Sequence, residues 1–176
     1  MYEIDLHVPM MHHKVEAEQF RNEFFEADEH IINGSALLDK MDYESWLIHI
    51  ANNRQESTVK SGWVVSDTFF AVKKSDTRII GIIDIRHSLN NDILKNYWGH
   101  IGYAVRPSER KNGYATKMLK MGLEYAKTLN IEKVMLGCYL DNISSIRTIE
   151  KCGGTLTETK TYTDGKSLNI YWIKLK

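Results

Sequence analysis

A short turn in the middle of the chain has the residues that a phosphate-binding site needs. The segment Arg110-x-x-Gly113-x-Ala115 follows an apolar strand, which Pro107 must end because proline cannot donate to a sheet ladder. Gly113 lacks a β-carbon, so the backbone can come close to a ligand. The free N–H groups at the start of the following helix would then suit phosphate oxygens. We therefore expect this turn to bind a phosphorylated ligand.

The helix after this turn is predicted from the spacing of its apolar residues. Its buried face is formed by Ala115, Met118, Leu119, Gly122, Ala126 and Leu129. These positions recur at helical spacing, and lysines with one glutamate occupy the opposite face. Asn130 is expected to end the helix, since asparagine tolerates a left-handed conformation.

A second motif follows the apolar run of residues 133–140, which we expect to be a buried strand. Asp141-Asn142 would cap a short helix that runs to about Cys152, and Gly153-Gly154 would end it. The side chain of Asn142 is expected to cap the helix, to contact a ligand, or to do both.

The remaining elements follow from the same patterns. Alternation predicts a strand from Tyr2 to Val8, and helical spacing predicts helices over residues 13–27 and 42–53. Further strands are expected over residues 68–74, 78–86, 98–105, 155–163 and 167–175, with residues 88–95 as a loop. The predicted fold class is α+β with a mixed α/β sheet. It has about seven mostly antiparallel strands, a central parallel pair at 98–105 and 133–140, and about four helices.

The composition disfavours several classes of protein. The 176 residues suit a single domain over residues 1–176, and 23 acidic against 23 basic residues disfavour a nucleic-acid partner. The two cysteines, Cys138 and Cys152, form neither a disulfide scaffold nor a metal-ligand pair, so no metal is expected. We see no signal peptide and no apolar stretch that could span a membrane, and we expect a cytoplasmic protein.

The two motifs together resemble the GNAT superfamily of acyl-CoA N-acyltransferases. That family carries Arg/Gln-x-x-Gly-x-Gly/Ala between its fourth strand and third helix, matched here from Arg110 to Ala115. After its fifth strand it carries Asn-x-x-Ser/Ala-x-x-x-Ile/Tyr-Glu-Lys-x-Gly, matched from Asn142 to Gly153. The order of elements agrees from end to end. Residues 99–110 with Ile85-Arg86-His87 look like a group of bacterial predicted acetyltransferases whose substrates are unassigned.

The resemblance implies acetyl-CoA as co-substrate and transfer of its acetyl group, by direct attack, to a primary amine of a small molecule or peptide. The pantetheine arm would enter between the two central strands, and backbone amides of residues 111–116 would hold the pyrophosphate. Arg106, Arg110 and Lys111 would add positive charge near the phosphates. The expected coenzyme-binding residues are Tyr103, Ala104, Val105, Arg110, Lys111, Asn112, Gly113, Tyr114, Ala115, Thr116, Asn142 and Ser145.

The catalytic side chains are less well specified than the coenzyme site. An alkyl amine has a pKa near ~10, so it must lose a proton before it attacks. His100 stands where many relatives carry glutamate, and it is either this base or a structural histidine. Many relatives place a tyrosine acid where this chain has Ile149. Tyr139 is the candidate acid, with Tyr103 and Tyr114 as alternatives.

The sequence is also compatible with other functions. The missing tyrosine motivates a non-catalytic acyl-CoA-binding sensor, and a nucleotide-binding module is a third class. Asp84, Arg86 and His87 end a strand and either face the acceptor or are solvated. Acceptor identity depends on the first two helices, the loop at residues 88–95 and the final hairpin. That hairpin edge and the neutral net charge are compatible with a homodimer.

Overall fold

The computed structural model describes residues 3–175 and contains two antiparallel sheets. The first has the order β1-β2-β3-β4, built from Ile4–His7, Ser66–Lys73, Ile79–Arg86 and Ile101–Val105. The second has the order β5-β7-β6, built from Lys133–Tyr139, Ser167–Lys174 and Thr155–Thr161. The helices are α1 (Lys14–Glu26), α2 (Tyr43–Asn53), α3 (Tyr114–Thr128) and α4 (Ile143–Lys151). The predicted α+β class is confirmed; Tyr2, where we expected the first strand to begin, lies outside the described residues.

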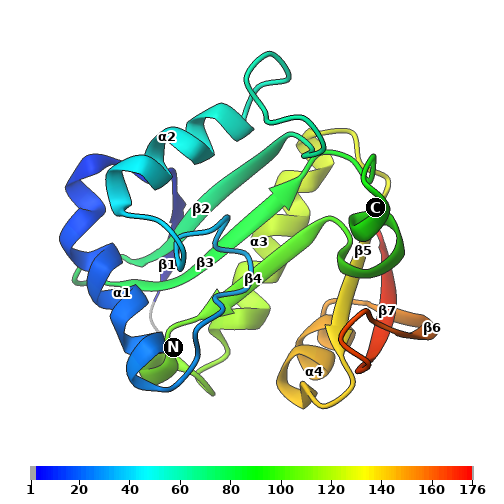
Figure 1. Ribbon diagram of the computed structural model, residues 1–176. Coiled ribbons are helices and arrows are strands. Elements are labelled where there is room, and N and C mark those ends of the chain that lie inside the picture. The colour runs from blue at the N-terminus through cyan, green and yellow to red at the C-terminus, as the bar shows by residue number, and fades with distance from the viewer. Residues whose placement is uncertain (1–2, 176) are drawn as a thin grey trace.

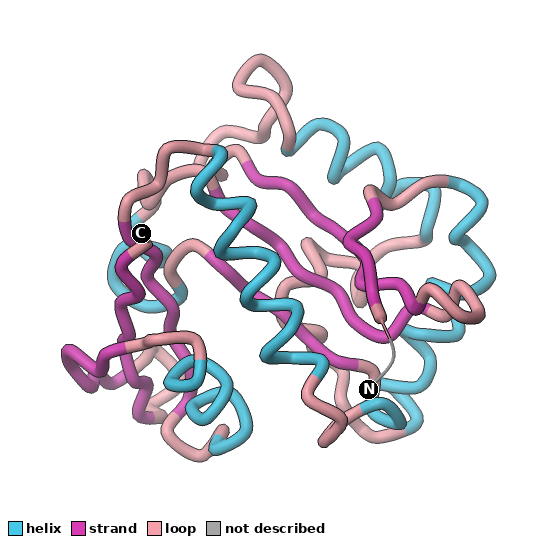
Figure 2. Tube along the Cα trace, turned by 180° about the vertical axis from the view of Figure 1, so that it is seen from behind, coloured by secondary structure: helices cyan, strands magenta, loops and turns pink. Residues whose placement is uncertain are grey.

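Helices cover both faces of the larger sheet (Figure 1), and each face has its own core. On one face α1 and α2 bury Phe20 and Trp46 against Phe70 of β2. On the other face α3 runs across the sheet, as the view from behind shows (Figure 2), and Met118 and Leu119 are buried there. Successive residues of β3 therefore serve different cores. Within the described residues, no helix is both long and apolar enough to cross a bilayer.

The central strand pair differs from the expectation. β4 and β5 are neighbours that lie close at one end and diverge toward the other (Figure 1). No parallel ladder joins them among the described residues; their backbones meet at one isolated bridge, between Gly99 and Leu136, in antiparallel geometry. The strand expected from Trp98 begins only at Ile101, because Leu94–Trp98 form a π-helical turn and Gly99 adopts a φ of 70°.

Two glycines and one histidine make this closed end of the strand pair. The backbone N–H of His100 donates to Met135 O at 2.8 Å, and the ring nitrogen Nδ1 of His100 accepts from Met135 N at 3.0 Å. A β-carbon at Gly99 would lie 2.1 Å from Met135 O, and one at Gly137 would lie 1.7 Å from Tyr97 O. The strands can therefore touch here only because these positions lack side chains.

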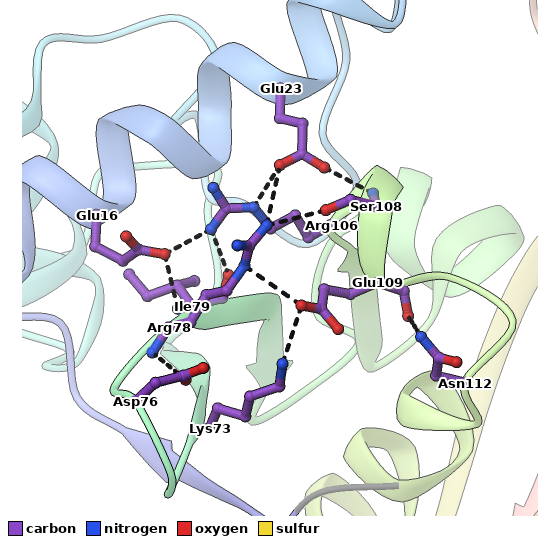
Figure 3. Close-up of polar contacts among 10 residues, drawn as sticks. All are labelled: Glu16, Glu23, Lys73, Asp76, Arg78, Ile79, Arg106, Ser108, Glu109 and Asn112. Atoms are coloured by element: carbon purple, nitrogen blue, oxygen red, sulfur yellow. Dashed lines mark hydrogen bonds and ion pairs between the residues drawn. The ribbon is translucent and has the colours of Figure 1, made fainter.

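A buried arginine fixes α1 to the far end of β4 (Figure 3). Arg106 Nη1 donates to Glu16 and to Ile79 O, and its Nε donates to Glu23. The other oxygen of Glu23 accepts the backbone N–H of Ser108 at 2.6 Å. Since Ser108 lies in the turn that leads into α3, this network holds that turn against α1.

Gly137→Ala should destabilise the protein, because the new β-carbon meets backbone that cannot move aside without opening the closed end. We expect a loss of about 2 kcal/mol in the free energy of unfolding. Urea denaturation measures it. Gly122→Ala is the matched control, since its β-carbon would meet only the flexible ends of side chains, with Ile83 Cδ1 nearest at 2.7 Å. Equal stabilities for the two variants would contradict the backbone contact.

Candidate functional site

One cavity of about 1260 Å³ opens where β4 and β5 diverge. The start of α3, α4 and the loop between α1 and α2 complete its wall. Most residues predicted for the site line it: Tyr103, Ala104, Val105, Arg110, Lys111, Gly113, Tyr114, Ala115, Thr116, Tyr139, Asn142 and Ser145. His100 and Asn112 are absent from the lining.

The turn before α3 presents a row of unused backbone donors. Gly113 is the N-cap with a φ of 79°, and no side chain caps the helix. Lys111 also adopts a positive φ, of 64°. Among the described residues, none of the N–H groups of residues 111–116 has a hydrogen-bond acceptor. Donors that converge at a helix N-terminus bind anions well, because the helix dipole adds to their partial positive charge.

The free edge of β4 supplies further backbone groups. In the ladder with β3, Ala104 pairs with Ile82, and the hydrogen bonds at both ends of the ladder make this a mutually hydrogen-bonded pair. Because bonding alternates along an antiparallel strand, Tyr103 and Val105 direct their N–H and C=O groups away from β3, toward the gap. Val105 O accepts from Arg110 Nε at 3.2 Å. The backbone N–H of Tyr103 can therefore donate to an extended ligand, whereas that of Ala104 already donates to β3.

Of the positively charged side chains near the turn before α3, Arg110 forms an ion pair within the protein and three others remain available to a ligand. Arg110 pairs with both oxygens of Glu29, at 2.6 and 2.7 Å, so its guanidinium ties the turn to the loop between α1 and α2. Lys111, Arg147 and Lys151 line the cavity, and none of them has an ion-pair partner in the described part of the chain. The cations available to a ligand are therefore these three rather than Arg110.

Three of the predicted residues lie elsewhere. His100 is 7% exposed and accepts a backbone N–H at the closed end. Burial, helped by Arg86, lowers the pKa of His100 to about 4, so the ring is neutral. The guanidinium of Arg106 is buried in the α1 network. Asn112 is exposed, and its Nδ2 donates to Glu109 O at 3.3 Å.

The second motif places polar groups beside the end of β5. Asn142 is the N-cap of α4, and its Oδ1 accepts Ser145 N–H at 3.1 Å. The hydroxyls of Ser145 and Tyr103 lie 2.9 Å apart, which links α4 to β4 across the cavity. Burial raises the pKa of Tyr103. The helix-cap role of Asn142 is thus present in the structure, and the residue also faces the cavity.

The position of the usual family tyrosine is apolar here. Ile149 is fully buried, lines the cavity and can donate no proton. Tyr139 lines the cavity from β5, and its hydroxyl donates to Asp164 at 2.7 Å. Burial, and then Asp164, raise the pKa of Tyr139 to about 12. Tyr139 is therefore protonated at neutral pH.

The cavity continues to the face of β3 that α1 and α2 cover. Asp84 and Arg86 line it there, whereas His87 lies outside and pairs with Asp67 at 2.7 Å. Burial raises the pKa of Asp84, and Arg86, 3.3 Å away, partly offsets that effect. The sequence did not decide whether Asp84, Arg86 and His87 face the acceptor. It also did not indicate that Trp63 and residues 31–40 line the cavity. The turn signal at Asn33-Gly34-Ser35 was the one sequence cue to that loop.

The comparisons with known proteins agree with this geometry. The model of the acetyltransferase (GNAT) domain matches residues 10–155. No curated protein sequence matches the chain. Among solved structures, one is of a protein assigned to the GnaT acetyltransferase family from Bordetella pertussis, with a TM-score of 0.70, 11% identity and coverage of 98% of this chain and 96% of that one.

Two further structures belong to acetyltransferases with stated activities. The spermidine/spermine N-acetyltransferase SpeG of Vibrio cholerae, in mutant forms, has a TM-score of 0.66 and 15% identity, covering 98% of this chain and 94% of its own. The microcin C7 self-immunity acetyltransferase MccE, in complex with acetyl-CoA and AMP, has a TM-score of 0.67 and 21% identity, covering 98% and 92%. At these identities the likeness shows the fold. Since the domain model spans most of the sequence, the chain belongs to the GNAT acetyltransferase family.

Proposed function

We propose that residues 1–176 form one N-acetyltransferase domain that moves the acetyl group of acetyl-CoA to a primary amine of a small molecule or peptide. The main support for the proposal is that the backbone N–H groups of residues 111–116 have no hydrogen-bond acceptor among the described residues and that their turn lines the cavity between β4 and β5. The similar fold of MccE, whose structure holds acetyl-CoA, supports it.

The residues present suit acetyl-CoA. Backbone donors of residues 111–116 would hold the pyrophosphate, and Lys111, Arg147 and Lys151 would neutralise the phosphates. The free amide of Tyr103 would pair with the pantetheine arm along the edge of β4. When bound, the coenzyme supplies an acetyl thioester, and its thiol is the leaving group. Asn142 would cap α4 and contact the arm.

The protein's own groups would orient the reactants and handle protons. A backbone N–H at the β4 edge would polarise the acetyl carbonyl. Tyr139 lines the cavity and remains the candidate proton donor to the leaving thiolate, a role for which its hydroxyl must leave Asp164. His100 joins β4 to β5 and lies outside the cavity lining, so we assign it a structural role.

Two measurements test this function. Calorimetry should show acetyl-CoA binding, and thiol release from acetyl-CoA should accelerate with at least one amine of a broad panel. Binding without thiol release would favour the sensor function that Ile149 suggested. No binding would exclude both.

Gly113→Glu should abolish acetyl-CoA binding, because it puts bulk and negative charge where the pyrophosphate would lie. Gly165→Glu is the matched control: both glycines have a similar positive φ, of 79° and 82°, and Gly165 lies in open space in the final hairpin. The dissociation constant from calorimetry should rise at least about a hundredfold for the first variant only. Unchanged affinity of Gly113→Glu would refute the assignment of the turn.

His100→Asn should flatten the pH dependence of stability. Because the pKa of His100 is lowered in the folded state, to about 4, its stabilising contribution is complete above its ordinary pKa of 6.5 and is lost as the pH falls toward 4. Between pH 7.5 and pH 5 the wild type should therefore lose roughly 2 kcal/mol more than the variant. Asparagine keeps an acceptor for Met135 N–H.

Urea denaturation at the two pH values measures the effect, with His12→Asn as a surface control. Acetyl transfer by His100→Asn should keep its pH profile, because the residue does not face the cavity. Loss of activity across the whole pH range in a folded variant would restore His100 as the base.

A further inference from the structure

The cavity extends past the coenzyme end into a second part, which we call the acceptor arm. Parts of three segments line it: residues 31–40, 62–66 and 91–98. Asn91 Nδ2 donates to Gly62 O at 2.8 Å and ties two of these segments together. The third is held on β4, since a β-carbon at Gly34 would lie 2.2 Å from Gly102 O.

The loop at residues 31–40 is held in one conformation by Trp46 of α2. Trp46 is fully buried, and its indole N–H donates to Ser35 O at 2.8 Å. Ala36 and Leu37 both adopt positive φ, of 48° and 74°, which is strained for residues with a β-carbon. The surrounding contacts therefore force this loop to present Leu37 at the cavity.

Part of the cavity lining is apolar and exposed to water. Ile31, Leu37, Trp63 and Ile93, which we call the apolar rim, all line the cavity and are 71%, 37%, 41% and 53% exposed. Large apolar side chains that line a cavity while exposed to water mark a surface that a ligand covers. They come from all three segments of the arm, so the rim depends on the tertiary structure.

The charges of the acceptor arm are balanced. Asp84 lies 3.3 Å from Arg86, and Asp39 lies 3.6 Å from Lys40. This part of the cavity therefore has no excess charge to attract a ligand with several like charges, in contrast to the unpaired lysines and arginine of the coenzyme end.

One buried carboxylate marks the inner end of the arm. Asp84 lines the cavity and pairs across β3 and β4 with Gly102, next to the free amide of Tyr103. Thr68 Oγ1 donates to one of its oxygens at 2.9 Å, Ser66 also bonds to the carboxyl group, and Arg86 Nε lies near the other oxygen. Because each carboxylate oxygen accepts more than one hydrogen bond, Asp84 can still accept from an N–H of a ligand.

We propose that the acceptor is a small primary amine on an apolar carbon skeleton, aromatic or branched aliphatic and without a second charge. Its nitrogen donates to the Asp84 carboxylate beside the coenzyme end, and its skeleton packs on the apolar rim. This inference rests on the proposed N-acetyltransferase function and names its substrate class.

Thiol release from acetyl-CoA tests the proposal with 2-phenylethylamine, 3-methylbutylamine, phenylalanine and spermidine. Phenylalanine adds a carboxylate to the first amine, and spermidine offers several cationic amines. We expect kcat/KM for the two apolar amines to exceed the other two by at least about tenfold. A preference for phenylalanine or spermidine would overturn the proposal.

Trp63→Ala and Ile93→Ala should each raise KM for 2-phenylethylamine about tenfold and leave kcat within about twofold, because they remove packing at a distance from the reacting atoms. Ile48→Ala is the matched control, since Ile48 is exposed and lies outside the cavity lining. Asp84→Asn should raise KM for both apolar amines without changing the dissociation constant of acetyl-CoA. Rim variants that behave like Ile48→Ala would overturn the proposal.

A binding measurement separates this proposal from the proposed function. Calorimetric titration of 2-phenylethylamine into the protein loaded with coenzyme A needs no turnover. Binding that Trp63→Ala weakens would support the acceptor arm even if no amine were acetylated, in which case the N-acetyltransferase function fails by itself. Absence of binding to the loaded wild type would overturn the acceptor assignment.

Discussion

The structure depends on one short contact, the junction of His100 with Met135 at the closed end of β4 and β5. Here the backbone and ring of His100 join the two sheets by two hydrogen bonds, and flanking glycines let the strands touch. Past this point no ladder holds the strands together in the described chain. The cavity exists because pairing stops there, which leaves the backbone of Tyr103 free for a ligand.

The arginines that look most suited to phosphate serve the scaffold instead. A buried guanidinium needs carboxylate partners, and Arg106 finds them on α1 (Figure 3). Arg110 finds Glu29 on the next loop. Arg106 therefore holds the turn before α3 against α1, and Arg110 holds it against the loop that follows α1. The turn itself offers uncharged N–H groups, which need no side chain and bind an anion through their direction.

Much of the fold could be predicted from local patterns. Apolar spacing located α1, α2 and α3, and the capping residues and glycines around it located α4. Asn142 caps α4 through a side-chain bond to the backbone, as expected, and Asp42 caps α2 in the same way. The final hairpin turns at Gly165. The divergence of β4 and β5 could not be predicted in this way, because it depends on how Gly99 and Gly137 approach backbone from distant parts of the chain. Such contacts leave no periodic signal.

The sequence by itself determined the family and indicated the turn to which we assign the coenzyme, because a glycine turn at a helix start acts through its own backbone. Only the tertiary structure decided which side chains face the cavity. It turned His100 into the strand junction and left Ile149 as buried apolar lining. It also placed Ile31, Trp63 and Ile93 in the lining of one cavity. Burial and pairing are properties of the packed chain, and residue type alone does not fix them.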